Sequence, residues 1–94
     1  MIRDDEDIYK DTIDIDKKLI RTGKIVYTKD DYFFIQPYEQ INPNIIGRDS
    51  NVYSNLSYVD KSQRHLIEVG AKVRFKVELG RQGLHSRSVE VIED

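Results

Sequence analysis

Residues 24–36, which have the sequence KIVYTKDDYFFIQ, decide the fold that we expect. Two runs rich in β-branched and aromatic residues, 24–28 and 32–36, flank the polar residues 29–31. Runs of this kind favour β-strands, and a short polar break between them is typical of a hairpin. The stretch therefore predicts two antiparallel strands joined by a tight turn.

The two faces of the second strand have different chemistry. Successive side chains of a strand point to opposite faces, so Tyr32 and Phe34 share one face while Phe33 and Ile35 share the other. Alternation alone leaves open which of the two faces points into the core. An aromatic face that is exposed would need an explanation.

Three further strands are predicted downstream. Residues 52–56 form a short β-rich run, residues 71–79 alternate strictly between apolar and charged side chains, and residues 86–92 contain a last run around two valines. The alternating charges Lys72, Arg74 and Lys76 are ordinarily the solvent side of such a strand. Five strands without a long helix predict an all-β fold, a five-stranded antiparallel barrel.

Composition limits the class of protein. A chain of 94 residues forms one small domain. It has no cysteine, no apolar run long enough to span a bilayer and no hydrophobic segment near its first residue. We therefore expect a cytoplasmic protein that does not enter a membrane.

Charge is unevenly distributed. Residues 1–18 hold four of the fifteen basic and seven of the seventeen acidic side chains, which leaves a net charge of −3 there and +1 over the remainder. We divide the chain into an acidic N-terminal extension, residues 1–20, and a barrel domain, residues 21–94. The extension is a solvated lead, a short strand with Ile13 and Ile15 on one face, or a segment that packs back on the body through Ile8, Ile13 and Ile20.

Three blocks carry a resemblance to a known family. They are Gly23–Tyr27 with Tyr32–Ile35, then Val52–Leu56, and finally Glu68–Val77 with the glycine loop and strand of Gly80–Val89. In order and spacing, residues 21–92 resemble the bacterial cold-shock domain, a barrel of the oligonucleotide-binding type. The resemblance implies a protein that binds single-stranded RNA or DNA with low sequence specificity.

The resemblance also implies a binding site, with Tyr32 and Phe34 facing the ligand while Phe33 and Ile35 point into the barrel. Bases would stack on four aromatic side chains, phosphates would meet two lysines, and the glycine loop would add backbone or base contacts. Asn55 stands where the family has a base-stacking histidine. The implied nucleic-acid-binding residues are Lys24, Tyr27, Lys29, Tyr32, Phe34, Tyr53, Asn55, Arg81, Gln82 and Arg87.

Catalysis is not expected, because no nucleophile elbow, phosphate-binding loop or histidine-centred triad is present. His65 and His85 lack the spacing of metal ligands, so we expect neither a metal nor a cofactor. Two functions remain open. One is an RNA chaperone or regulator that binds single strands; the other is a protein–protein adaptor that keeps the barrel and has lost the ligand.

Overall fold

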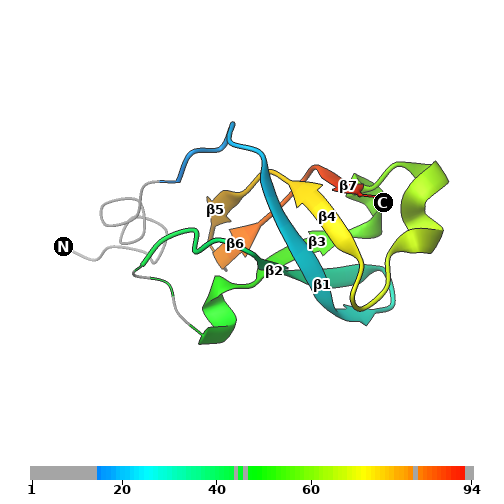
Figure 1. Ribbon diagram of the computed structural model, residues 1–94, viewed down its shortest axis with the longest axis horizontal. Helices are drawn as coiled ribbons and strands as arrows, with labels where there is room; N and C mark the ends of the chain where they lie inside the picture. Colours follow the sequence, from blue (N-terminus) through cyan, green and yellow to red (C-terminus); the bar gives the residue numbers. More distant parts are fainter. Residues whose placement is uncertain (1–14, 44, 46, 82, 93–94) are drawn as a thin grey trace.

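The computed structural model describes residues 15–43, 45, 47–81 and 83–92, and within them the chain is mostly β-structure (Figure 1). The strands are β1 (Arg21–Lys29), β2 (Tyr32–Pro37), β3 (Val52–Asn55), β4 (Lys72–Phe75), β5 (Glu78–Gly80), β6 (Gly83–His85) and β7 (Val89–Val91). Short 3-10 helices are η1 (Gly47–Ser50), η2 (Leu56–Tyr58) and η3 (Lys61–Leu66). In this described part, no helix is long and apolar enough to cross a membrane.

All seven strands belong to one curled sheet in the order β5-β6-β3-β2-β1-β4-β7. Neighbours are antiparallel except β3 and β6, which are parallel. The last hairpin consists of β4 and β5 on one arm and of β6 and β7 on the other. It contributes strands to both ends of the sheet order, since β5 and β6 pair at one end and β4 and β7 at the other. The hairpin therefore bends the sheet into a barrel-like shape (Figure 1).

The all-β prediction is confirmed, whereas the prediction of five antiparallel strands is wrong in both number and direction. The strand predicted over residues 71–79 is divided into β4 and β5, and the strand predicted over residues 86–92 is shortened to β7 and preceded by β6, which was not predicted. At Ser86 the backbone N–H donates to Tyr53 O at 2.9 Å, and Ser86 O accepts from Ser54 Oγ at 3.0 Å. Because Ser86 bonds to β3 rather than to β5, the ladder of the hairpin is interrupted there.

The predicted first hairpin is present, with Asp30 and Asp31 as its turn. Asp30 adopts a φ of 53°, a left-handed conformation that aspartate tolerates better than most residues. Near the other end of the hairpin, Gly23 faces Pro37, and a Cβ on Gly23 would collide with the carbonyl oxygen of Gln36. The two strands therefore approach closely only because residue 23 has no side chain.

A β-bulge at Val26 controls which side chains of β1 point outward. Ile25 lies opposite Ile35, but Tyr27 lies opposite Phe34, so Val26 is the extra residue. In a regular strand Ile25 and Tyr27 would share a face. The bulge reverses the phase, so that Ile25 is buried and Tyr27 is exposed.

The core lies inside the curl of the sheet. Phe33 and Ile35 are fully buried in it, as the resemblance implies. The buried hydrophobic residues are Ile25, Phe33, Ile35, Ile45, Val52, Val59, Val73, Phe75, Val77, Leu84, Val89 and Val91.

The described end of the N-terminal extension lies outside the sheet. Ile15 packs partly buried against the core cluster, whereas Ile20 is exposed. Ile8, Ile13 and the cluster of acidic residues near them lie outside the described residues.

Candidate functional site

Four aromatic side chains meet on the outer face of the sheet. Tyr27 comes from β1, Tyr32 and Phe34 from β2, and Tyr53 from β3; we call this group the aromatic cluster. Five pairs of ring centroids lie 5.7 to 6.3 Å apart. Tyr32 and Tyr53 are stacked at 5.9 Å, and the other four pairs are tilted or edge-on. These are ordinary aromatic contact geometries, so the cluster is a contiguous surface of π-faces and ring edges.

The cluster is accessible to a ligand. Tyr27 is 45% exposed and Tyr53 is 40% exposed, while Tyr32 and Phe34 are partly buried between them. On the opposite side of the same strands, Phe33 and Ile35 are fully buried. The predicted division of β2 into a core face and an outer aromatic face is therefore confirmed.

Packing within the cluster changes the chemistry of one hydroxyl. The pKa of Tyr32 is raised above its usual value, first by desolvation and then by its hydrogen bond with Tyr27 and by Coulombic effects of Tyr27, Asp30 and Tyr53. Because the ordinary pKa of tyrosine is about 10, the phenol is uncharged at neutral pH with or without this shift. The raised pKa therefore affects only alkaline conditions.

Charged residues of both signs flank the aromatic cluster. Lys29 lies opposite Tyr32 in the ladder and Lys24 lies opposite Gln36, so both exposed lysines are on the outer face. Asp30 and Asp31 are exposed at the adjoining turn. The two lysines therefore place positive charge at two points along β1, and the two aspartates place negative charge at the tip of the hairpin.

Asn55 is on the outer face beside Tyr32, as the resemblance implies. Its side-chain oxygen, however, accepts a hydrogen bond from Ser57 N at 3.0 Å and caps η2. Asn55 therefore has a local structural role at the position expected to contact a base.

A hollow of about 530 Å³ adjoins the cluster at the glycine loop. Phe34 and Tyr53 form one side of it, and the last hairpin forms the other. The hairpin residues that line it are Gly80, Arg81, Gly83, Leu84, His85 and Arg87. The structure thus brings Arg81 and Arg87 next to the aromatic cluster, while Gln82, the remaining expected loop residue, lies outside the described residues.

His85 is the residue in this region that the sequence did not assign to the site. It pairs with Tyr53 across the parallel β3–β6 contact and lies 3.3 Å from Glu78, Nε2 to Oε2. The register of the Gly80–Gly83 turn places Glu78 opposite His85. This local register is the feature of the sequence from which the pairing of His85 with Glu78 could have been predicted. The parallel contact with β3 is non-local and left no mark in the local pattern.

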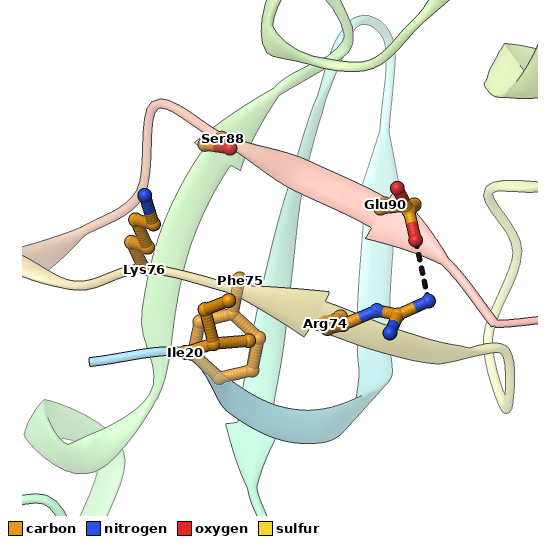
Figure 2. Close-up of a pocket in the computed structure, with 6 residues that line it drawn as sticks. All are labelled: Ile20, Arg74, Phe75, Lys76, Ser88 and Glu90. Carbon is orange, nitrogen blue, oxygen red and sulfur yellow. Dashed lines mark hydrogen bonds and ion pairs between the residues drawn. The ribbon is translucent and has the colours of Figure 1, made fainter. Parts of the chain in front are cut away.

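A second, smaller depression lies over β4 and β7 (Figure 2). Ile20 lies beside Phe75 at one end, and the Arg74 guanidinium meets Glu90 Oε1 at 2.6 Å at the other. Both charged side chains are at least half exposed, and exposed ion pairs contribute little stability. This surface is typical of the solvent side of an antiparallel strand.

Among the described residues, no three histidine or acidic side chains come together in a way that could hold a metal ion. The region with concentrated ligand-binding features is thus the aromatic cluster with its adjoining hollow.

In comparisons with known proteins, no protein-family model matches the chain, and no curated protein matches it.

Proposed function

We propose that this protein binds single-stranded RNA or DNA on the aromatic cluster, with low sequence specificity. The observation that carries the proposal is the set of four contiguous, accessible rings on three neighbouring strands. Each base stacked on an aromatic side chain contributes about 1–3 kcal/mol, and every base has a π-face. Stacking therefore gives affinity with little sequence preference.

The surroundings of the rings fit a nucleic-acid strand. Lys24 and Lys29 supply positive charge along β1, and Arg81 and Arg87 supply it at the hollow. Outside the acidic segment 1–18, the chain has a net charge of only +1, so bulk attraction for phosphate is weak. Binding would accordingly depend on stacking, with local cations positioning the backbone.

The curled sheet and its last hairpin support the finer part of the proposal, a divergent barrel of the cold-shock type. Barrels of the oligonucleotide-binding class use the face of strands 2 and 3 together with the loops joining strands 1–2 and 4–5. In this chain the cluster lies on β1–β3, and the hollow joins it to the loop after Gly80. The activity we propose is that of a cytoplasmic RNA chaperone or regulator without catalytic function.

The test is a titration with a fluorescent oligo-pyrimidine strand at low and at physiological salt. The Tyr32→Ala, Phe34→Ala double variant removes the centre of the cluster, and Tyr58→Ala, an exposed tyrosine on η2, is the matched control. We expect wild-type protein and the control to bind, and the folded double variant to lose binding. Equal binding by the double variant, or no binding by wild-type protein at low salt, would overturn the proposal.

A protein–protein adaptor is the second candidate. Asp30 and Asp31 at the hairpin tip favour it, because carboxylates beside the rings oppose phosphate. Tyrosine and arginine are also enriched at protein interfaces. If wild-type protein fails to bind single strands, the next experiment is affinity capture with immobilised wild-type protein and with the immobilised Tyr32→Ala, Phe34→Ala variant. A protein partner that recognises these rings should be retained by wild-type protein and lost with the variant.

A further inference from the structure

His85 extends the row of rings beyond the aromatic cluster. It lies next to Tyr53 across the parallel contact between β3 and β6, and both residues line the hollow. Phe34, from the neighbouring strand β2, lines it as well. A single-stranded nucleic acid that crosses the outer face from β1 toward β6 would therefore reach the imidazole of His85 directly after Tyr53.

One contact and one packing constraint restrict the position of the His85 ring. Nε2 is 3.3 Å from the Glu78 carboxylate, and Cε1 and Nδ1 are 2.9 Å from the place where a Cβ on Gly80 would be. The ring thus occupies space that exists because residue 80 is glycine. A side chain held in this way loses little conformational entropy when a ligand binds.

The hollow also has cationic groups at its border. Arg87, whose side chain is 64% exposed, has its Nε 3.8 Å from Glu78 Oε2, and the exposed Arg81 lies on the loop. The volume of about 530 Å³ is within the range of sites for small ligands. One ring, apolar neighbours and cations at the border are the features that suit a nucleotide, which combines a flat base with a phosphate.

We infer that the hollow is a further nucleotide subsite, in which one base of a bound single strand stacks on His85 and its phosphate faces Arg81 and Arg87. This inference rests on the proposed function and adds a fifth ring to the binding row. His85 is a contact residue in this subsite, and Glu78 is a positioning residue that orients its ring.

The test compares His85→Ala and His85→Phe using oligo-pyrimidine strands of four and eight nucleotides. Loss of one stack should weaken binding of the longer strand about fivefold or more in His85→Ala. His85→Phe keeps a ring and should stay within about twofold of wild type. The four-nucleotide strand can bind the aromatic cluster alone, so its affinity should be the same for all three proteins.

Two results would overturn the inference. One is unchanged binding of the longer strand by His85→Ala; the other is equal weakening by His85→Ala and His85→Phe. If Tyr32→Ala, Phe34→Ala still abolishes binding in the same assay, the proposed function stands and only the subsite fails. If wild-type protein binds neither strand, the proposed function itself fails.

A measurement on wild-type protein avoids any folding defect of the variants. The ring-proton resonances of His85 should shift on addition of the eight-nucleotide strand and stay in place with the four-nucleotide strand. His65, which is exposed on η3, provides the internal control because it lies on a different element. A His85 signal that the longer strand leaves unmoved would contradict the subsite.

Discussion

The outer face of β1, β2 and β3 and the outer face of the paired strands β4 and β7, which we call the β4–β7 face, belong to the same sheet but have different surfaces. On β4–β7 the outward side chains include charges that pair with each other, as Arg74 does with Glu90. On β1–β3 four outward positions are aromatic and contact one another. A surface of paired charges is stable in contact with solvent alone. Contiguous exposed rings, in contrast, leave apolar surface in water, which is typical of an interaction site. This difference is the reason that we propose ligand binding on the face of β1, β2 and β3.

The largest effect we expect is on stability, from the core side of the strand that carries the cluster. Phe33→Ala should lower the free energy of unfolding by about 3–5 kcal/mol, because it removes a fully buried ring from the core. Phe34→Ala, on the outer face, should cost clearly less. Urea denaturation of both variants measures this, and equal losses would contradict the division of β2 into two faces.

The next effect is on binding and compares the two outer faces directly. Tyr32→Ala, Phe34→Ala should weaken oligo-pyrimidine binding by at least about 30-fold, since two stacks of about 1 kcal/mol or more are lost. Arg74→Ala, Glu90→Ala on the β4–β7 face should leave affinity within about twofold. Fluorescence anisotropy measures both, and a large loss in the second variant would assign binding to the opposite surface.

A smaller effect concerns the stability of the β4–β7 side. Gln63 on η3 accepts from Val91 N at 2.9 Å and donates to Val91 O at 3.1 Å. Gln63→Ala should therefore cost about 1–3 kcal/mol of stability, given about 0.5–1.5 kcal/mol for each hydrogen bond, without changing affinity. Thermal unfolding checks this, with the exposed Gln40→Ala as a control that should be nearly neutral.

The ion pair on the β4–β7 face should contribute less still. Arg74→Ala should change the free energy of unfolding by about 1 kcal/mol or less, because both partners are at least half exposed. The change should shrink further as salt is added. A loss well above this value, measured by denaturation at low and high salt, would show that the two outer faces differ less than we infer.

The smallest effect is confined to alkaline pH. The pKa of Tyr32 is raised in the folded protein, so deprotonation is easier in the unfolded chain. Its contribution to stability is therefore complete below the ordinary tyrosine pKa of about 10 and decreases as pH rises through the folded value. Stability measured from pH 9 to 11 should decline less steeply in Tyr32→Phe than in wild-type protein; identical slopes would argue against this role.

Local alternation predicted much of the fold. The hairpin follows from its two β-rich runs, and the separation of Phe33 and Ile35 from Tyr32 and Phe34 follows from the period of two along β2. Which of these faces is buried was expected from the order of the three resembling blocks. The outer position of Tyr27 depends on the Val26 bulge, which the same rule does not contain.

Non-local pairing accounts for what the sequence did not predict. The extra strand β6 and its separation from β7 depend on where Ser86 meets β3, and the place of His85 depends on its contact with Tyr53. Neither contact has a periodic signal, because each joins segments about thirty residues apart. The capping role of Asn55 was likewise hidden, since it requires η2 to begin directly after β3.

The contact of Gln63 with Val91 also bears on solubility. β7 is the last strand in the sheet order, and an open strand edge is a template on which further chains can add. The amide of Gln63 occupies both the donor and the acceptor of Val91, and Val59 bridges to Val89. The connection between β3 and β4 thus shields this edge, so Gln63→Ala is expected to aggregate more readily on heating as well as to unfold earlier.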